Sequence, residues 1–339
     1  MNAPSTATLQ APASSVRRAA RSVFGLLVLG GVVWVLCQTL YLALPYTRSG
    51  ANVIYDAKVD LMRKSIGGTS LFAKDAKHKV LVLGTSKVLS GFVPTVFDEV
   101  LGDGTSSFNG GLPGEERFMN NLATCLSGPD RPDVVLLTMP WSDVAKTGDD
   151  VHRGGDGEIM DAIFPFRHMP RDLCLFLIRS RSRGGLKAYY QSSGRTVTDM
   201  TANRGYYFIE GQSHFENNLL PDDFVLESDR PEIPLLRTGT AEAAQFKRLC
   251  ELLETHKVKA YYVPLYYRRH EFAPAAPNAE WQTVVAKCPN LSAIGPDYWQ
   301  FDNAQFADPV HLNPAGAEAY TRQLAELLRP VILSSPASH

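Results

Sequence analysis

A stretch without a single charged residue, Val23 to Leu44, constrains this chain more than any other part of its sequence. As an α-helix it would be roughly 33 Å long, which is enough to cross the hydrocarbon core of a bilayer. Arg17, Arg18 and Arg21 lie just before it, and positive charges in this position stay on the cytoplasmic side. The sequence therefore predicts a cytoplasmic tail over 1–22 and one transmembrane helix over 23–44, with all later residues outside.

A cleaved signal peptide is the alternative interpretation of the same segment. We disfavour it because the apolar run is longer than a usual signal-peptide core and no clean small-x-small cleavage site follows it. A buried helix of a soluble protein would not need an uncharged run of this length.

The overall composition is that of a globular protein. The chain has 339 residues, of which 45% are hydrophobic and 20% charged, and this length supports one large core or two modest ones. Its net charge of -1 provides no basic footprint for nucleic acid. The sequence contains no P-loop and no Cys/His cluster with zinc spacing, so we expect no cofactor and no metal. The spacing of the five cysteines does not reveal which of them pair.

Three segments follow the predicted transmembrane helix. Residues 45–77 are predicted to form a stalk that lifts the domain off the membrane, with a helical pattern over 55–63. Residues 78–330 form the predicted domain, and 331–339 a short tail. Residues 145–240 fit the domain's pattern poorly, and we expect a long insertion over the ligand edge, acting as a lid or binding loop. A solvated, partly mobile loop is the alternative.

Short apolar runs alternate with helical patterns throughout the predicted domain. Runs of Val and Leu are typical of parallel strands buried on both faces. We expect strands over 80–83, 106–108, 134–137 and 258–263, and helices over 91–101, 115–126, 241–256 and 315–328. This alternation predicts an α/β fold with a largely parallel sheet and helices on both faces.

The first predicted strand ends at Gly84-Thr85-Ser86. The carboxyl ends of parallel strands face the crevice where open α/β sheets bind ligands. A serine placed there can act as a nucleophile if a histidine reaches it. The alternative is an ordinary helix cap, because Ser and Thr are favoured N-cap residues.

Asp308 and His311 lie near the other end of the sequence, just before the last predicted helix. A carboxylate three residues before a histidine can accept a hydrogen bond from one ring nitrogen, which fixes the tautomer and leaves the other nitrogen as a base. Such a histidine would take the proton of Ser86 during attack on a carbonyl and later return it to the leaving group. Taken alone, a surface aspartate with a helix-capping histidine is the alternative.

Four short motifs are spread along the predicted domain in a fixed order. They are Gly84-Thr85-Ser86, Asn109-Gly110-Gly111-Leu112-Pro113-Gly114, Pro140-Trp141-Ser142-Asp143 and Asp308-Pro309-Val310-His311. Together they resemble the SGNH (GDSL-like) hydrolase and acyltransferase superfamily over about residues 78–330. The resemblance implies a flavodoxin-like three-layer sandwich with a mostly parallel sheet, preceded here by the transmembrane helix.

The resemblance also implies a role for individual residues. Ser86 would be the nucleophile, His311 the general base and Asp308 its orienting partner. The backbone N–H groups of Ser86 and Gly111, with the side chain of Ser142, would form the oxyanion hole that stabilises the tetrahedral intermediate. Ser142 departs from the family, which has an asparagine there, and losing one such donor costs about 3 kcal/mol.

Thr85, which replaces the usual acidic residue, and the N-terminal anchor bring the chain near the membrane-anchored branch of the superfamily. It is similar there to the periplasmic O-acetyltransferases of alginate and cellulose and to the D-alanyl transfer protein of teichoic acid. This implies a serine acyltransferase or esterase of the bacterial inner membrane with its catalytic domain in the periplasm. It would move an acetyl or similar small acyl group to or from an exopolysaccharide or cell-surface polymer through an acyl-Ser86 intermediate. A multi-pass membrane protein would donate the acyl group.

Two other functions stay open. One is a catalytically silent SGNH-like module that binds polysaccharide or scaffolds an export complex, which the missing asparagine supports. The other is a general carboxylesterase on the outer surface.

A group of aromatic and basic residues follows the last predicted strand. Tyr266, Tyr267 and Arg268 are predicted to bind substrate, since tyrosine rings stack on sugars and arginine binds anionic groups. Trp141 shares this prediction. The alternative is a tyrosine-rich rim that packs against the insertion.

Overall fold

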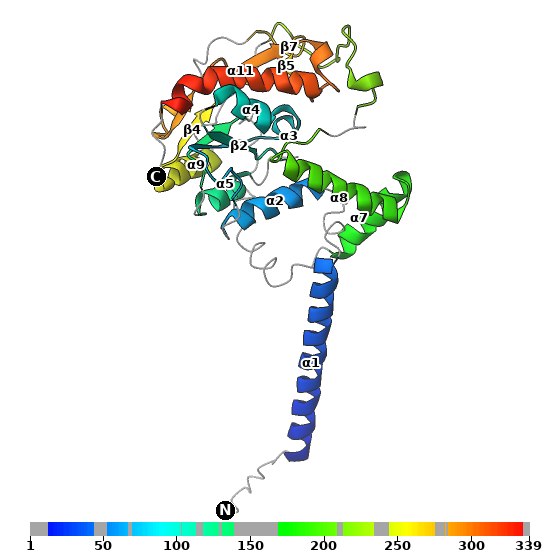
Figure 1. Cartoon of the computed structure of the whole chain (residues 1–339). Coiled ribbons are helices and arrows are strands. Elements are labelled where there is room, and N and C mark those ends of the chain that lie inside the picture. The colour runs from blue at the N-terminus through cyan, green and yellow to red at the C-terminus, as the bar shows by residue number, and fades with distance from the viewer. Residues whose placement is uncertain are drawn as a thin grey trace, which may run out of the picture.

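The computed structural model describes most of the chain (Figure 1). The described residues are 13–43, 53–66, 70–102, 104–112, 118–128, 131–138, 169–208, 213–233, 244–274, 282 and 284–334. Two predicted site residues, Trp141 and Ser142, lie outside these ranges, as do Gly114 and residues 145–168, 209–212 and 234–240 of the predicted insertion.

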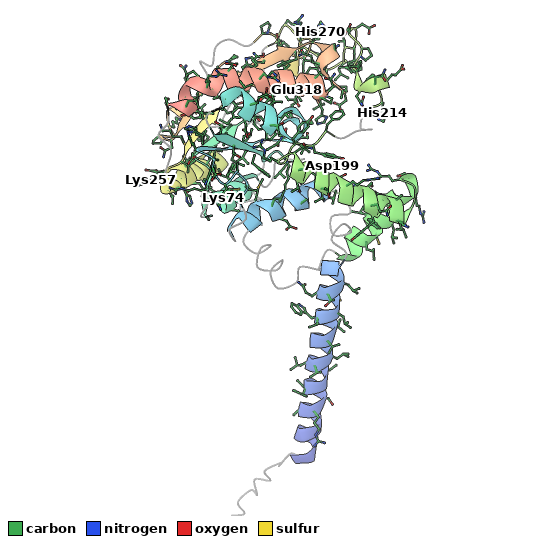
Figure 2. All side chains as sticks on the ribbon, in the orientation of Figure 1. Lys74, Asp199, His214, Lys257, His270 and Glu318 are labelled. Carbon is green, nitrogen blue, oxygen red and sulfur yellow. A yellow bond between two sulfur atoms is a disulfide. The ribbon has the colours of Figure 1, made fainter. Side chains whose placement is uncertain are left out.

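The uncharged run forms most of a single long helix, α1 (Ala13–Ala43). Its Ala19–Leu40 part has a mean hydropathy of 2.2 and is 0% buried. Figure 2 shows the side chains of α1 standing clear of the folded domain. Within the described part of the chain, α1 is the one helix long and apolar enough to cross a membrane, and it fits a membrane anchor or a signal sequence.

The centre of the domain is a five-stranded sheet in the order β2-β1-β3-β4-β6, and all of its pairings are parallel. Its strands are β1 (His78–Leu83), β2 (Thr105–Asn109), β3 (Val134–Leu137), β4 (Lys259–Tyr262) and β6 (Leu291–Ala293). A separate parallel pair is formed by β5 (Leu265–Arg268) and β7 (Tyr298–Phe301). The prediction of an α/β fold with a mostly parallel sheet is confirmed.

Helices cover both faces of this sheet (Figure 1). They are α3 (Ser86–Gly91), α4 (Pro94–Leu101), α5 (Phe118–Leu126), α9 (Ala244–His256) and α11 (Pro314–Leu333), and short 3-10 turns lie at Glu216–Asn218 and Asn303–Gln305. Alternation along β1 explains the two layers, because successive side chains of a strand point to opposite faces. Val80 and Val82 pack in one core with α4 and α11, whereas Leu81 and Leu83 pack in the other with α5 and α9.

The segment predicted as a stalk is part of the domain over α2 (Val53–Ile66). Ile54, Lys58 and Met62 recur every four residues and are buried, so one face of the helix is covered. This face lies against α5 and α8 (Leu186–Ala202). The stalk prediction is therefore wrong for these residues, because an amphipathic helix with a buried face packs on the domain instead of lifting it.

The described part of the predicted insertion also packs on the domain. It contains α7 (Met169–Ser182) and α8, which contact each other. The end of α8 reaches the sheet, where Asn109 N–H donates to the carbonyl of Arg204 at 2.9 Å. Just beyond it, Tyr207 N–H donates to the carbonyl of Leu89 in α3 at 3.1 Å. The insertion thus meets β2 and α3 where the first two sequence motifs lie.

Candidate active site

Ser86 lies at the carboxyl edge of the sheet, where β1 turns into α3. A side chain at Gly84 would come within 2.2 Å of Val88 Cγ2 and 2.7 Å of Thr138 Oγ1, so the sharp turn requires glycine. Thr85 is the N-cap of α3, since its Oγ1 accepts from Lys87 N–H at 3.2 Å. The capping function considered for Ser86 therefore belongs to Thr85, and the Ser86 hydroxyl is left to other partners.

His311 connects Ser86 to Asp308. His311 Nε2 lies 3.0 Å from Ser86 Oγ, and its Nδ1 lies 2.9 Å from Asp308 Oδ2. Ser86 and His311 are 225 residues apart in the sequence. The structure therefore brings together the three side chains that the sequence proposed as nucleophile, base and orienting acid.

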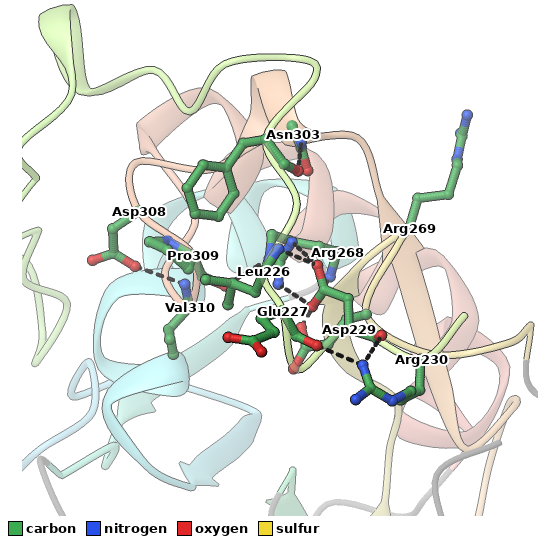
Figure 3. A network of polar contacts seen from close by, with 12 residues as sticks. Leu226, Glu227, Asp229, Arg230, Arg268, Arg269, Asn303, Asp308, Pro309 and Val310 are labelled. Atoms are coloured by element: carbon green, nitrogen blue, oxygen red, sulfur yellow. Dashed lines mark hydrogen bonds and ion pairs between the residues drawn. The ribbon is translucent and has the colours of Figure 1, made fainter. Parts of the chain in front are cut away.

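Asp308 is held in place by its own loop. Its Oδ1 accepts the backbone N–H groups of Val310 and His311, each at 2.7 Å, and Figure 3 shows the bond to Val310. Burial raises the pKa of Asp308, but its interactions with His311 and with these N–H groups outweigh burial, so the pKa lies below its ordinary value. Asp308 thus stays ionised and holds the proton of His311 on Nδ1.

Arg268 supports the same loop from inside the protein. Its Nε donates to the carbonyl of Pro309 at 2.9 Å, and its Nη1 and Nη2 donate to both oxygens of Asp229 at 3.0 and 2.7 Å (Figure 3). The side chains of this pair are only 1% and 2% exposed. The substrate-binding prediction for Arg268 is wrong, because this guanidinium is buried and its donors are committed to Asp229 and to the Asp308–His311 loop.

The two neighbouring tyrosines are also buried instead of lining a sugar-binding surface. Tyr266 is 0% and Tyr267 6% exposed. Tyr266 donates its hydroxyl proton to the carbonyl of Lys87 at 2.9 Å, and Lys87 Nζ donates to the carbonyl of Tyr266 at 3.0 Å. Lys87 Nζ also lies 3.8 Å from the centre of the Tyr267 ring. These tyrosines therefore pack beneath the helix that carries Ser86.

Lys87 predicts how the free energy of unfolding changes with pH. Burial lowers its pKa from 10.5 to about 8, with Glu271 and Asp308 opposing that shift and Arg268 adding to it. Below pH 8 the folded protein carries the full cost of the buried charge, and this cost disappears as pH rises toward 10.5. Relative to a Lys87→Met variant, the parent should therefore gain up to about 3 kcal/mol across this interval. Urea unfolding at several pH values measures it, and parallel curves would contradict it.

Gly111 does not supply the expected oxyanion donor. Its N–H donates to Asn109 Oδ1 at 2.9 Å, while the N–H groups on either side donate to the carbonyls of Val82 and Gly84. A side chain at Gly111 would come within 2.4 Å of Leu89 N, so this glycine serves close packing. The Ser86 N–H, at the first position of α3, has no acceptor within the helix and remains the candidate donor.

A small pocket lies over the Ser86 and His311 side chains. The residues that line it are Ser86, Leu89, Ser90, Phe208, Ser213, Ala307, Asp308 and His311. Ser213 Oγ donates to the carbonyl of Ala307, which connects the insertion to the loop before Asp308. The sequence did not identify Phe208 and Ser213 as site residues. The aromatic run Tyr206-Tyr207-Phe208 in the predicted insertion was a signal for Phe208, and Ser213 had none.

No protein-family model and no curated protein sequence matches the chain. Within the described ranges, no group of three or more His, Cys, Asp or Glu residues is arranged to hold a metal ion. The arrangement that stands out chemically is the hydroxyl–imidazole–carboxylate relay beside a small pocket.

Proposed function

We propose that this protein is a membrane-anchored serine acyltransferase or esterase that works through an acyl-Ser86 intermediate. The observation that carries the proposal is the relay of 3.0 Å from Ser86 Oγ to His311 Nε2 and 2.9 Å from His311 Nδ1 to Asp308 Oδ2. Nucleophilic serine catalysis requires a base within hydrogen-bond reach and a third group that orients it. The order of the four motifs, which resembles the SGNH superfamily, adds to this support.

The reaction would proceed in two halves. His311 Nε2 takes the proton of Ser86 as Oγ attacks the acyl carbonyl, and the Ser86 N–H donates to the resulting oxyanion. The intermediate collapses to acyl-Ser86 when the leaving oxygen takes the proton from His311. An acceptor hydroxyl then gives its proton to His311 and attacks the ester carbonyl. The bond to Ser86 Oγ breaks as Oγ takes the proton back from His311, and the acceptor leaves with the acyl group. Asp308 stabilises the imidazolium in both halves.

Three features favour a small acyl group and an extracytoplasmic acceptor. The pocket beside Ser86 is small and is lined in part by the apolar side chains of Leu89 and Phe208. The disulfide between Cys250 and Cys288 suits an oxidising compartment such as the periplasm. As a membrane anchor, α1 would keep the site near a polymer that leaves a bacterial inner membrane, where a multi-pass partner would donate acetyl or a similar group.

Detection of the acyl-enzyme tests this proposal. Full-length protein in nanodiscs is incubated with p-nitrophenyl acetate, and its intact mass is measured. We expect a mass increase of one acetyl group that maps to Ser86 and disappears in Ser86→Ala, with at least about 10³-fold slower p-nitrophenolate release. The exposed Ser182→Ala variant should behave like the parent. A folded parent without adduct or turnover would favour the silent polysaccharide-binding module.

A second measurement separates transfer from hydrolysis. The acetylated protein is mixed with a short glucan or a short uronan, and the products are identified by mass spectrometry. Acetylated sugar is expected if the protein is a transferase of surface polymers. Release of acetate alone, at the same rate with and without sugar, would instead identify a general carboxylesterase.

A further inference from the structure

Lys58 is an unusual residue to find inside this domain. It belongs to α2, and its side chain is 0% exposed between the buried Ile54 and Met62 on the same helix face. Its Nζ donates to Asn109 Oδ1 at 3.1 Å and to the carbonyl of Gly111 at 2.5 Å. Both acceptors are uncharged, and no described carboxylate forms an ion pair with this amine. Burying an amine costs free energy unless the amine is hydrogen-bonded, and these two bonds offset part of that cost.

Asn109 passes this contact on to the helix that carries Ser86. Its Nδ2 donates to the carbonyls of Val88 and Phe92 at 2.7 Å and approaches that of Leu89 at 3.2 Å. These carbonyls belong to the last turn and the C-cap of α3. The amide of Asn109 therefore connects the end of β2 to the C-terminal end of α3. Ser86, the proposed nucleophile, is the first residue of this helix, six residues before the C-cap Phe92.

The same amide oxygen also holds the turn that follows β2. Asn109 Oδ1 accepts both Lys58 Nζ and the N–H of Gly111, whose own carbonyl accepts Lys58 as well. Lys58 thus closes a ring of hydrogen bonds around residues 109–111. Without its amine, the Gly111 carbonyl would lose a buried donor, and the amide of Asn109 would be held by fewer bonds.

We propose that Lys58 is a positioning residue for the Ser86 reaction, a role that rests on the proposed function. It fixes α3 and the 109–112 turn from α2, and so makes the segment next to α1 part of the catalytic unit. α1 ends at Ala43 and α2 begins at Val53, and a chain of this length spans at most about 35 Å. The helix nearest the membrane anchor is thereby a structural element of the active site.

A Lys58→Met variant tests this role, because methionine fills similar space without the amine. In full-length protein we expect the rate of Ser86 acetylation at saturating p-nitrophenyl acetate to fall about 10- to 100-fold, the size expected from a small misplacement of reacting groups. KM and the melting temperature should change little. Lys58→Gln, which retains a donor, should recover part of the rate. Lys74→Met, which removes an exposed lysine, is the matched control.

Amide hydrogen exchange provides a readout that does not depend on activity. In Lys58→Met, the amides of residues 110–112 and of α3 should exchange faster than in the parent, whereas those of α9 should not. Unchanged exchange and rate would overturn the inference. A melting temperature that falls together with exchange rising over the whole domain would show a general structural role and also overturn it. A parent without any Ser86 adduct would overturn the proposed function instead, and the local exchange would still test the Lys58 link.

Discussion

Replacing Asp308 with asparagine is expected to lower the rate of Ser86 acylation by about 10⁴-fold while the fold remains intact. The two oxygens of Asp308 have different tasks. Oδ1 accepts the backbone N–H groups of Val310 and His311 and lies 3.1 Å from His311 Nδ1, whereas Oδ2 is the nearer partner of Nδ1 at 2.9 Å. In asparagine the amide oxygen would keep the two backbone bonds, since only an acceptor fits there. The amide nitrogen would then face His311 Nδ1.

That substitution would reverse the protonation of the imidazole. An N–H donor facing Nδ1 makes Nδ1 an acceptor and moves the ring proton to Nε2, the nitrogen 3.0 Å from Ser86 Oγ. A protonated Nε2 cannot accept the serine proton, so attack on the carbonyl would lack its base. The loss of rate is thus expected from the wrong tautomer and not from a disordered loop.

The measurement is the burst of p-nitrophenolate release, with circular dichroism to establish that the variant is folded. Asp223→Asn, which changes an exposed aspartate, is the matched control and should acylate at the parental rate. A rate for Asp308→Asn within tenfold of the parent would show that Asp308 does not set the tautomer.

The fold and the central relay were predictable because both depend on patterns that the sequence carries. Short Val/Leu runs such as Val80–Leu83 indicate strands buried on both faces, and parallel strands bring their carboxyl ends to one edge. Ser86 follows this rule at the end of β1, whereas His311, 225 residues later, was identified by its spacing from Asp308 and not by a strand end. Strand β6, only three residues long, carries too little pattern to be predicted.

Two of the errors concern basic residues that have a buried partner far away in the sequence. Arg268 was predicted to bind substrate because arginine binds anionic groups, but it is buried and paired, as buried arginines usually are. Its partner Asp229 lies 39 residues earlier, in a segment without a clear secondary-structure pattern. Lys58 lies in the segment predicted as a stalk, and its acceptor Asn109 is 51 residues away. Sequence spacing reveals partners within one helix turn but not across the fold.

Breaking the buried pair of Arg268 and Asp229 on one side should cost far more stability than removing an exposed ion pair. Arg268→Met leaves the Asp229 carboxylate buried without its partner, and Asp229→Leu does the same to the guanidinium. Each single variant should lower the free energy of unfolding by about 3–5 kcal/mol, because the remaining charge is uncompensated. The exposed pair of Arg269 and Asp302, with side chains 60% and 57% exposed, is the control, and its removal should change stability by less than about 1 kcal/mol.

The double variant Arg268→Met/Asp229→Leu separates stability from positioning. With both charges gone and apolar side chains in their place, much of the lost stability should return, since a buried pair replaced by apolar residues is often neutral. Activity should not return with it, because the carbonyl of Pro309 has then lost the Nε donor that holds the Asp308–His311 loop. Urea unfolding and the acylation rate of the three variants measure the two effects separately. Recovery of the parental acylation rate in the double variant would show that the bond to Pro309 does not position the loop, and that Arg268 contributes to the fold alone.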